Sequence, residues 1–266
     1  MTKIAFFDVD GTMINVPHQL LKPTDKTIHA LKEFQKQGNY IVVASARGVK
    51  PECLDEIPFD GFIGCDGGYI EFHQEVLLNN VFTVKDLNLQ NSIYEATNGQ
   101  YIINERATSY FSDIDGELIK KHLKLYNGTD KLPDDYDDHW RFQNIKANTV
   151  TALFYNAKDL HEALDMLPQE WSINAYDTGH IRMDVHPQGY TKGTACQYLY
   201  QKLGISKEDT YAFGDGENDI EMLHLVGTSI AMGNADVEVK KHASTVTLTV
   251  DKDGIADFFE KEFKIK

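Results

Sequence analysis

A chain of 266 residues with 42% hydrophobic and 25% charged residues is long enough for a large core without disulfide bonds. Its net charge of −15 at pH 7 opposes nucleic acid and anionic membranes, and an anionic substrate would need a metal ion or local cations. The three cysteines have no zinc spacing, and no apolar run suits a secretion signal or membrane span. We therefore expect a soluble, cytoplasmic protein that binds neither nucleic acid nor membrane.

The first part of the chain predicts alternating strands and helices. Residues 4–7, 40–45 and 61–65 are short apolar runs of the kind found in strands buried on both faces. Between the first two, residues 24–37 have an apolar stripe at helical spacing, and Thr24 can cap the helix. A strand–helix–strand order at this spacing predicts a parallel, doubly wound sheet.

The middle of the chain, residues 81–185, has a different texture. Its patterns predict strands with alternating polarity at 100–105 and 148–156, a helix with one apolar face at 158–167 and a hairpin turn at 177–179. This mixture predicts an α+β domain inserted between two halves of a core, which would comprise residues 1–80 and 186–266.

The last part of the chain returns to the alternation of the first. We expect a helix at 191–204, a strand at 210–215, a short helix at 217–226 and strands at 229–233 and 244–249. The predicted fold class is therefore α/β, with a doubly wound parallel-sheet (Rossmann-like) core and an inserted α+β domain.

Acidic residues follow two of the predicted core strands. Asp8 and Asp10 come directly after residues 4–7, and Asp215 ends the strand at 210–215. Ligands of open parallel sheets bind at the carboxyl ends of the strands, where these side chains would meet. Closely spaced carboxylates favour a divalent cation between them, and hard oxygen ligands suit Mg²⁺ better than zinc. Two similar segments, DIDGE at 113–117 and DKDGI at 251–255, lack a comparable apolar strand and predict surface turns.

Further polar residues could complete a phosphate site. Ser45 ends the second strand, where its hydroxyl and the Ala46 amide could bind phosphate oxygens, although a structural cap is an alternative. Lys192 begins a predicted helix, whose N-terminus also attracts anions, although a solvated lysine is an alternative. Asn218 and Asp219 open the helix after Asp215, and one of them could serve only as its cap.

These four pieces, in this order, resemble the motifs of the haloacid dehalogenase superfamily of aspartate-dependent phosphatases. The matching elements are DVDGT at 8–12, Ser45, Lys192 within YTKGTA, and GDGEND at 214–219. The segment AMGNADVEVK at 231–240 and the DG of DKDGI are similar to the Cof-type branch, whose cap also lies between the second and third motifs. The chain departs from the common pattern in having Ala46 for glycine and Asp66-Gly67-Gly68 where Asn-Gly-Ala is frequent.

The resemblance implies a two-step phosphoryl transfer to water. Asp8 would be the nucleophile and Asp10 the general acid and base, under a cap that closes over the site. Mg²⁺ would be held by the carboxylates of Asp8 and Asp215 and by the backbone carbonyl of Asp10. Asp219 would support Lys192 or the water shell of the metal. The implied phosphate-binding residues are Val9, Ser45, Ala46, Lys192 and Asn218. The substrate would be a small phosphorylated metabolite such as a sugar phosphate.

Three other functions fit parts of the pattern. A phosphomutase of the same superfamily would share the motifs. A receiver-type signalling domain also has a parallel sheet with clustered acids, a hydroxyl and a lysine, but it needs only about 120 residues and no insertion. A protein that binds a phosphorylated ligand without catalysis could retain the scaffold, although it would not need Asp10.

Overall fold

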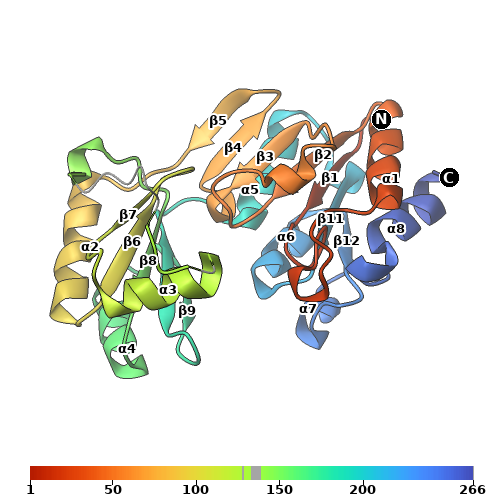
Figure 1. Ribbon diagram of the computed structural model, residues 1–266. Coiled ribbons are helices and arrows are strands. Elements are labelled where there is room, and N and C mark those ends of the chain that lie inside the picture. The colour runs from red at the N-terminus through yellow and green to blue at the C-terminus, as the bar shows by residue number, and fades with distance from the viewer. Residues whose placement is uncertain (128, 133–138, 266) are drawn as a thin grey trace. The chain divides into compact units, whose positions relative to one another are not determined.

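In the computed structural model, the described part of the chain comprises residues 1–127, 129–132 and 139–265 (Figure 1). It forms two compact units, one of residues 1–79 with 190–266 and the other of residues 80–189. The inserted unit ends at residue 189, beyond the predicted boundary at 185. It includes the whole of strand β10 (Arg182–His186), which pairs within the sheet of this unit. Among the described residues, no helix combines the length and apolarity needed to cross a lipid bilayer.

The first unit is built around an eight-stranded sheet in the order β13-β12-β11-β1-β2-β3-β4-β5. Its strands are β1 (Ile4–Phe7), β2 (Tyr40–Ala44), β3 (Gly61–Gly64), β4 (Tyr69–Phe72), β5 (Glu75–Asn79), β11 (Thr210–Gly214), β12 (Thr228–Ala231) and β13 (Thr245–Val246). Neighbours from β13 to β3 are parallel, which confirms the predicted core. The antiparallel hairpin β4–β5 extends one edge and was not predicted.

Helices cover both faces of this sheet and enclose two separate cores. The helices are α1 (Asp25–Lys36), α5 (Lys192–Lys202), α6 (Ile220–Leu225), α7 (Val237–Lys241) and α8 (Gly254–Phe263). Phe7 packs in one core with residues of α1 and α8, which lie side by side (Figure 1). Phe6 points to the opposite face and packs with residues of α5, α6 and α7. The apolar run 4–7 is therefore buried on both faces, as its composition predicted.

Aromatic rings fill the core beneath β1 and β11. The rings of Phe7 and Phe213 stack with their centroids 5.0 Å apart. On the helices, Phe34 stacks on Phe259 with centroids 4.8 Å apart. Burial of each such ring contributes about 2 kcal/mol, so these residues fix β1 against β11 and the two helices against the sheet. The predicted cap of α1 is also present, because the Thr24 side chain accepts a hydrogen bond from the Thr27 N–H.

The second unit contains a five-stranded antiparallel sheet in the order β7-β6-β8-β10-β9. The remaining strands are β6 (Gln100–Asn104), β7 (Ser109–Phe111), β8 (Thr149–Leu153) and β9 (Ser172–Tyr176). Helices α2 (Val84–Ala96) and α4 (Ala157–Met166) share one apolar core with this sheet. Helix α3 (Glu117–Asn127) packs on Ile102, Phe111 and Leu153. The inserted unit is therefore α+β, as predicted.

Candidate active site

The carboxyl ends of β1 and β11 bring three aspartates together. These strands are direct parallel neighbours, and the Asp8 N–H donates to the Phe213 carbonyl at 3.0 Å. Asp8, Asp215 and Asp219 each place a carboxylate oxygen within 4.8 Å of the others. Asp8 is buried, with 7% of its surface exposed, so its charge is largely removed from solvent. The predicted meeting of the first and last motifs is thus present in the structure.

Lys192 supplies the cation of this cluster. It is the first residue of α5, whose N-cap Thr191 forms a reciprocal capping box with Thr194. Its Nζ donates to Asp8 Oδ1 and to Asp219 Oδ1, both at 2.8 Å, and only 2% of the residue is exposed. Burial alone would lower the pKa of Lys192, but the Asp219 and Asp8 carboxylates raise it well above its ordinary value. The buried lysine is therefore charged at neutral pH.

Asp219 serves chiefly as the anchor of Lys192. Its Oδ1 accepts from the ammonium, and its Oδ2 accepts from the backbone N–H groups of Asp215 and Gly216, each at 3.0 Å. Both oxygens therefore already have partners, and the side chain is fully buried. Asp219 is consequently less available to a metal than Asp8, whose Oδ2 accepts no hydrogen bond from the described residues.

Asp8 and Asp215 are suited to hold a divalent cation. Burial raises the pKa of Asp8 to about 8, although the Lys192 ammonium opposes this shift. Burial also raises the pKa of Asp215 to about 6, against a hydrogen bond from Thr12. Three carboxylates thus share one ammonium group, and a second cation would favour their ionised forms. Oxygen ligands on adjacent strand ends fit a hard divalent ion.

Asp10 lies at the surface and is held by an arginine. Arg47 Nε donates to Asp10 Oδ2 at 2.9 Å, and Arg47 Nη2 donates to Asp10 Oδ1 at 2.8 Å. This bidentate contact fixes the plane of the carboxylate. Sequence reasoning did not predict the pair, although Arg47 follows Ser45 by two residues and β1 lies beside β2. Arg47 therefore joins the loop after β2 to the turn after β1.

The predicted phosphate-binding groups surround the ends of β1 and β2. Ser45 is buried, and its Oγ accepts from the Arg47 N–H at 3.2 Å. Within the described residues, the N–H groups of Val9 and Ala46 donate no hydrogen bond, which leaves both available to an anion. Asn218 is exposed, and its Nδ2 donates to Asp66 Oδ1 at 3.3 Å. The structure therefore brings Asn218 to the loop after β3, which sequence reasoning had not connected with it.

The loop after β3 has an unusual backbone. Cys65, Asp66 and Gly67 have consecutive positive φ values of 52°, 49° and 100°. A Cβ atom at Gly67 would lie 2.1 Å from the carbonyl oxygen of Thr191. Only glycine allows this close approach, so Gly67 lets the loop contact the start of α5. The loop therefore also fixes the residue that precedes Lys192.

Of the two other DxDG segments, only 113–117 is the predicted turn. Asp113 Oδ1 accepts from the Asp115 N–H at 3.0 Å in an exposed turn. The segment 251–255 instead spans the end of a short 3-10 helix (Val250–Lys252) and the start of α8. There, Asp251 Oδ2 accepts from Asn15 Nδ2 at 2.9 Å, and Asp253 Oδ1 accepts from Thr24 Oγ1 at 2.6 Å, so the segment contacts residues that follow β1.

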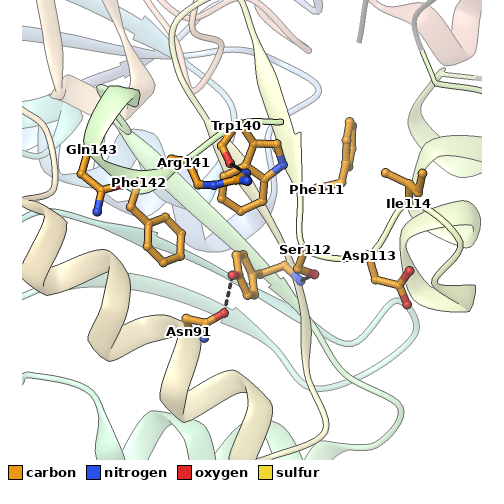
Figure 2. Close-up of a pocket in the computed structure, with 10 residues that line it drawn as sticks. Asn91, Phe111, Ser112, Asp113, Ile114, Trp140, Arg141, Phe142 and Gln143 are labelled. Atoms are coloured by element: carbon orange, nitrogen blue, oxygen red, sulfur yellow. Dashed lines mark hydrogen bonds between the residues drawn. The ribbon is translucent and has the colours of Figure 1, made fainter. Parts of the chain in front are cut away.

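A pocket of about 700 Å³ lies in the second unit, and its lining includes none of the predicted site residues. Figure 2 shows that aromatic side chains contribute much of its wall, among them Phe111, Trp140 and Phe142. Its polar groups include Asn91, whose Oδ1 accepts a hydrogen bond from Tyr101. No acidic cluster of the kind formed by Asp8 and Asp215 lies in the described part of this unit.

Comparison with known proteins gives full-length matches. Residues 5–259 match the family described as haloacid dehalogenase-like hydrolase. YkrA of Bacillus subtilis (strain 168), named as a candidate phosphatase, is 30% identical over 96% of this chain and 95% of its own. The pyridoxal phosphate phosphatase YbhA of Escherichia coli (strain K12) is 26% identical over 97% of each chain. The solved structure of a HAD subclass IIB sugar phosphatase is 27% identical, covers 100% of both chains and superposes with a TM-score of 0.79.

Proposed function

Because the chain belongs to the haloacid dehalogenase-like hydrolase family, we propose that it is a Mg²⁺-dependent phosphatase of small phosphomonoesters. The observation that carries the proposal is the buried contact of Lys192 Nζ with Asp8 Oδ1 at 2.8 Å, beside Asp215. A nucleophilic carboxylate, a fixed ammonium group and a second acidic ligand are the parts that phosphoryl transfer through an aspartyl-phosphate requires.

Asp8 is proposed to attack phosphorus in the first step. Its carboxylate displaces the alkoxide of the substrate, and a phosphoryl group is then bonded to Asp8. The Lys192 ammonium stabilises the charge on the phosphoryl oxygens, together with the N–H groups of Val9 and Ala46, the Ser45 hydroxyl and the Asn218 amide. Asp219 keeps the ammonium in place, since it accepts from Lys192 at 2.8 Å.

Asp10 is proposed to move the protons in both steps. It donates a proton to the departing alkoxide and then accepts one from the water that attacks the aspartyl-phosphate. Arg47 holds the Asp10 carboxylate through two hydrogen bonds and so determines its orientation before substrate arrives. Attack by water releases phosphate and regenerates the Asp8 carboxylate.

The carboxylates of Asp8 and Asp215 and the backbone carbonyl of Asp10 are proposed to hold Mg²⁺. When bound, the ion would neutralise charge on the phosphate oxygens in a strongly acidic protein. The substrate is proposed to be a small phosphorylated metabolite, a sugar phosphate or a similar compound. Support comes from two similar proteins, one named as a sugar phosphatase and the other as a pyridoxal phosphate phosphatase. Their matches cover 100% and 97% of this chain.

Hydrolysis of p-nitrophenyl phosphate, with and without Mg²⁺, tests the proposed function. We expect turnover that depends on Mg²⁺, ceases with EDTA and is lost in Asp8→Asn. A receiver-type protein would instead be phosphorylated once without turnover, and a binding protein would show neither event. A phosphomutase would transfer the phosphoryl group between hydroxyls of a sugar phosphate without releasing phosphate, so phosphate release from a panel of phosphomonoesters separates it from a hydrolase.

A further inference from the structure

The carboxylate of Asp215 is held on two sides by residues of the segments 8–12 and 231–240 that have so far been given no role of their own. Thr12 Oγ1 donates to Asp215 Oδ1 at 2.9 Å, and Asn234 Nδ2 lies 3.4 Å from Asp215 Oδ2. Hydrogen bonds of this kind orient a ligating carboxylate, so it need not lose rotational freedom when the metal binds. Both donors leave further lone pairs of the carboxylate available.

Thr12 belongs to the turn that follows Asp10. The residue is completely buried, and its N–H donates to the Val9 carbonyl at 3.3 Å. Gly11, with φ of 94°, closes the turn, and its N–H donates to the Ile14 carbonyl at 2.7 Å. A Cβ at Gly11 would lie 2.0 Å from Asp215 Oδ2, so the turn is packed directly against the carboxylate. Thr12 therefore acts from a rigid position.

Asn234 connects the same turn with the C-terminal part of the chain. Its Nδ2 donates to the Gly11 carbonyl at 2.7 Å, and its Oδ1 accepts from the Val250 N–H at 2.9 Å. Val250 directly precedes Asp251, which accepts from Asn15 in the segment after the turn. Asn234 thus links the segment 231–240 to the turn beside Asp215 and to Val250, which directly precedes the segment 251–255.

We propose that Thr12 and Asn234 are positioning residues that hold the Asp215 carboxylate ready to bind the divalent ion. The proposal rests on the proposed function and assigns these residues to metal affinity rather than to phosphate binding or to folding alone. It gives the segment 231–240 a role in the site through Asn234, although the segment supplies no predicted metal ligand.

Direct titration of the purified full chain with Mg²⁺ by calorimetry, without substrate, tests the proposal. We expect Thr12→Val to weaken Mg²⁺ binding by about tenfold and Thr12→Ser, which keeps the hydroxyl, to restore most of it. Asn234→Ala should weaken binding by about threefold, since the residue is exposed and its contact with Asp215 is longer. The Mg²⁺ concentration for half-maximal turnover should rise by the same factors.

Two matched variants control for a general loss of stability. Thr210 is a buried threonine at the opposite end of β11, and its hydroxyl bonds to Lys207 O and Gly227 N. Asn39 accepts from a backbone N–H and donates to a carbonyl, as Asn234 does, but lies before β2. Thr210→Val and Asn39→Ala should lower the melting temperature and change Mg²⁺ affinity by less than about twofold.

The outcomes distinguish the positioning role of Thr12 and Asn234 from the proposed function. If the unaltered chain binds Mg²⁺ and Thr12→Val and Asn234→Ala bind it equally well, the positioning role is overturned while the phosphatase proposal stands. If Thr12→Val does not fold, Asn234→Ala alone decides, because its exposed side chain is not part of the core. If the unaltered chain binds no Mg²⁺, both proposals are overturned.

Discussion

Lys192 Nζ donates to Asp8 Oδ1 at 2.8 Å, although the two residues are 184 positions apart in the chain. Lys192 also contacts Asp219 at 2.8 Å, and all three side chains are buried. Within the described residues, this lysine is the cation of the acidic cluster at the ends of β1 and β11. Removing its charge would leave two carboxylates without their ammonium partner.

We therefore expect Lys192→Met to lower both stability and activity. Removal of one partner from a buried ion pair costs about 3–5 kcal/mol, because the remaining charge is left uncompensated. Urea denaturation would measure this loss, and inhibition by vanadate or phosphate would report the expected loss of anion binding. Lys22→Met is a suitable control, since Lys22 pairs with Glu56 at the surface. Equal stability of the two variants would contradict the role given to Lys192.

Asp10→Asn should separate proton transfer from metal binding. Loss of a general acid and base lowers kcat by about 10²–10⁴-fold, while the expected metal contact of Asp10 is its unchanged backbone carbonyl. The deficit in kcat/KM, which reports the step that releases the leaving group, should be smaller with p-nitrophenyl phosphate, whose leaving group needs no proton, than with a sugar phosphate. Steady-state kinetics on both substrates and a Mg²⁺ titration provide the measurement. An equal deficit in kcat/KM on both substrates would argue against proton donation by Asp10.

The contribution of Asp8 and Asp215 to the stability of the Mg²⁺-free protein should fall as the pH rises from about 4 to 8. The pKa of Asp8 is raised to about 8 and that of Asp215 to about 6, from an ordinary value near 4, by burial. The folded state therefore binds these protons more tightly than the unfolded state, and their stabilising effect is complete at low pH and lost as each group ionises. Melting temperatures with EDTA across this range should show the decline.

The same experiment with Mg²⁺ and with one variant gives the control. Saturating Mg²⁺ should restore stability at pH 8, because it binds the ionised carboxylates of the folded protein. Asp215→Asn should flatten the pH dependence in EDTA, since its amide does not titrate. An unchanged profile in Asp215→Asn would be inconsistent with the buried ionisation of Asp215.

Gly67→Ala should disturb the site through the start of α5. The new Cβ would lie 2.1 Å from the Thr191 carbonyl oxygen, at a residue with φ of 100°. The left-handed backbone costs about 1–3 kcal/mol, and the clash would also shift the residue before Lys192 and lower kcat. Gly38→Ala has a similar φ of 85° with no atom within 4 Å of the new Cβ, so it controls for the backbone cost alone. Equal activity of both variants would contradict the expected displacement.

The sequence was sufficient to predict the meeting of Asp8 and Asp215. Apolar runs identified β1 and β11, and parallel strands place their carboxyl ends at one edge, so residues just after them must converge. The helix predicted at 191–204 placed Lys192 near its N-terminus, but only the resemblance to the superfamily placed this lysine beside the acids. The prediction for the two acids depends on local patterns and on one rule of sheet topology, both of which a single sequence contains.

The sequence did not reveal the contacts made by Arg47, Thr12 and Asn234. Each depends on the path of a loop and on side-chain rotamers, which periodicity does not encode. The hairpin β4–β5 was also missed: none of the residues of β5 is buried, and its apolar run, residues 76–78, is shorter than the run at 4–7. Residues that support a site therefore escaped prediction more often than those that form it.

The stacked pair Phe7 and Phe213 has a consequence for the fidelity of folding. Each ring is followed closely by an acid of the cluster, Asp8 in one strand and Asp215 in the other, and the two rings are paired in the sheet. Neighbouring side chains of a strand face opposite ways, so a slip of one position would move Phe7 and Phe213 into the other core, where Phe6 and Ala212 pack, and would carry a carboxylate into the apolar interior. The aromatic pair thus favours the correct alignment of the two strands, since a misaligned chain would lose both the packing of its core and the contact of Asp8 with Lys192.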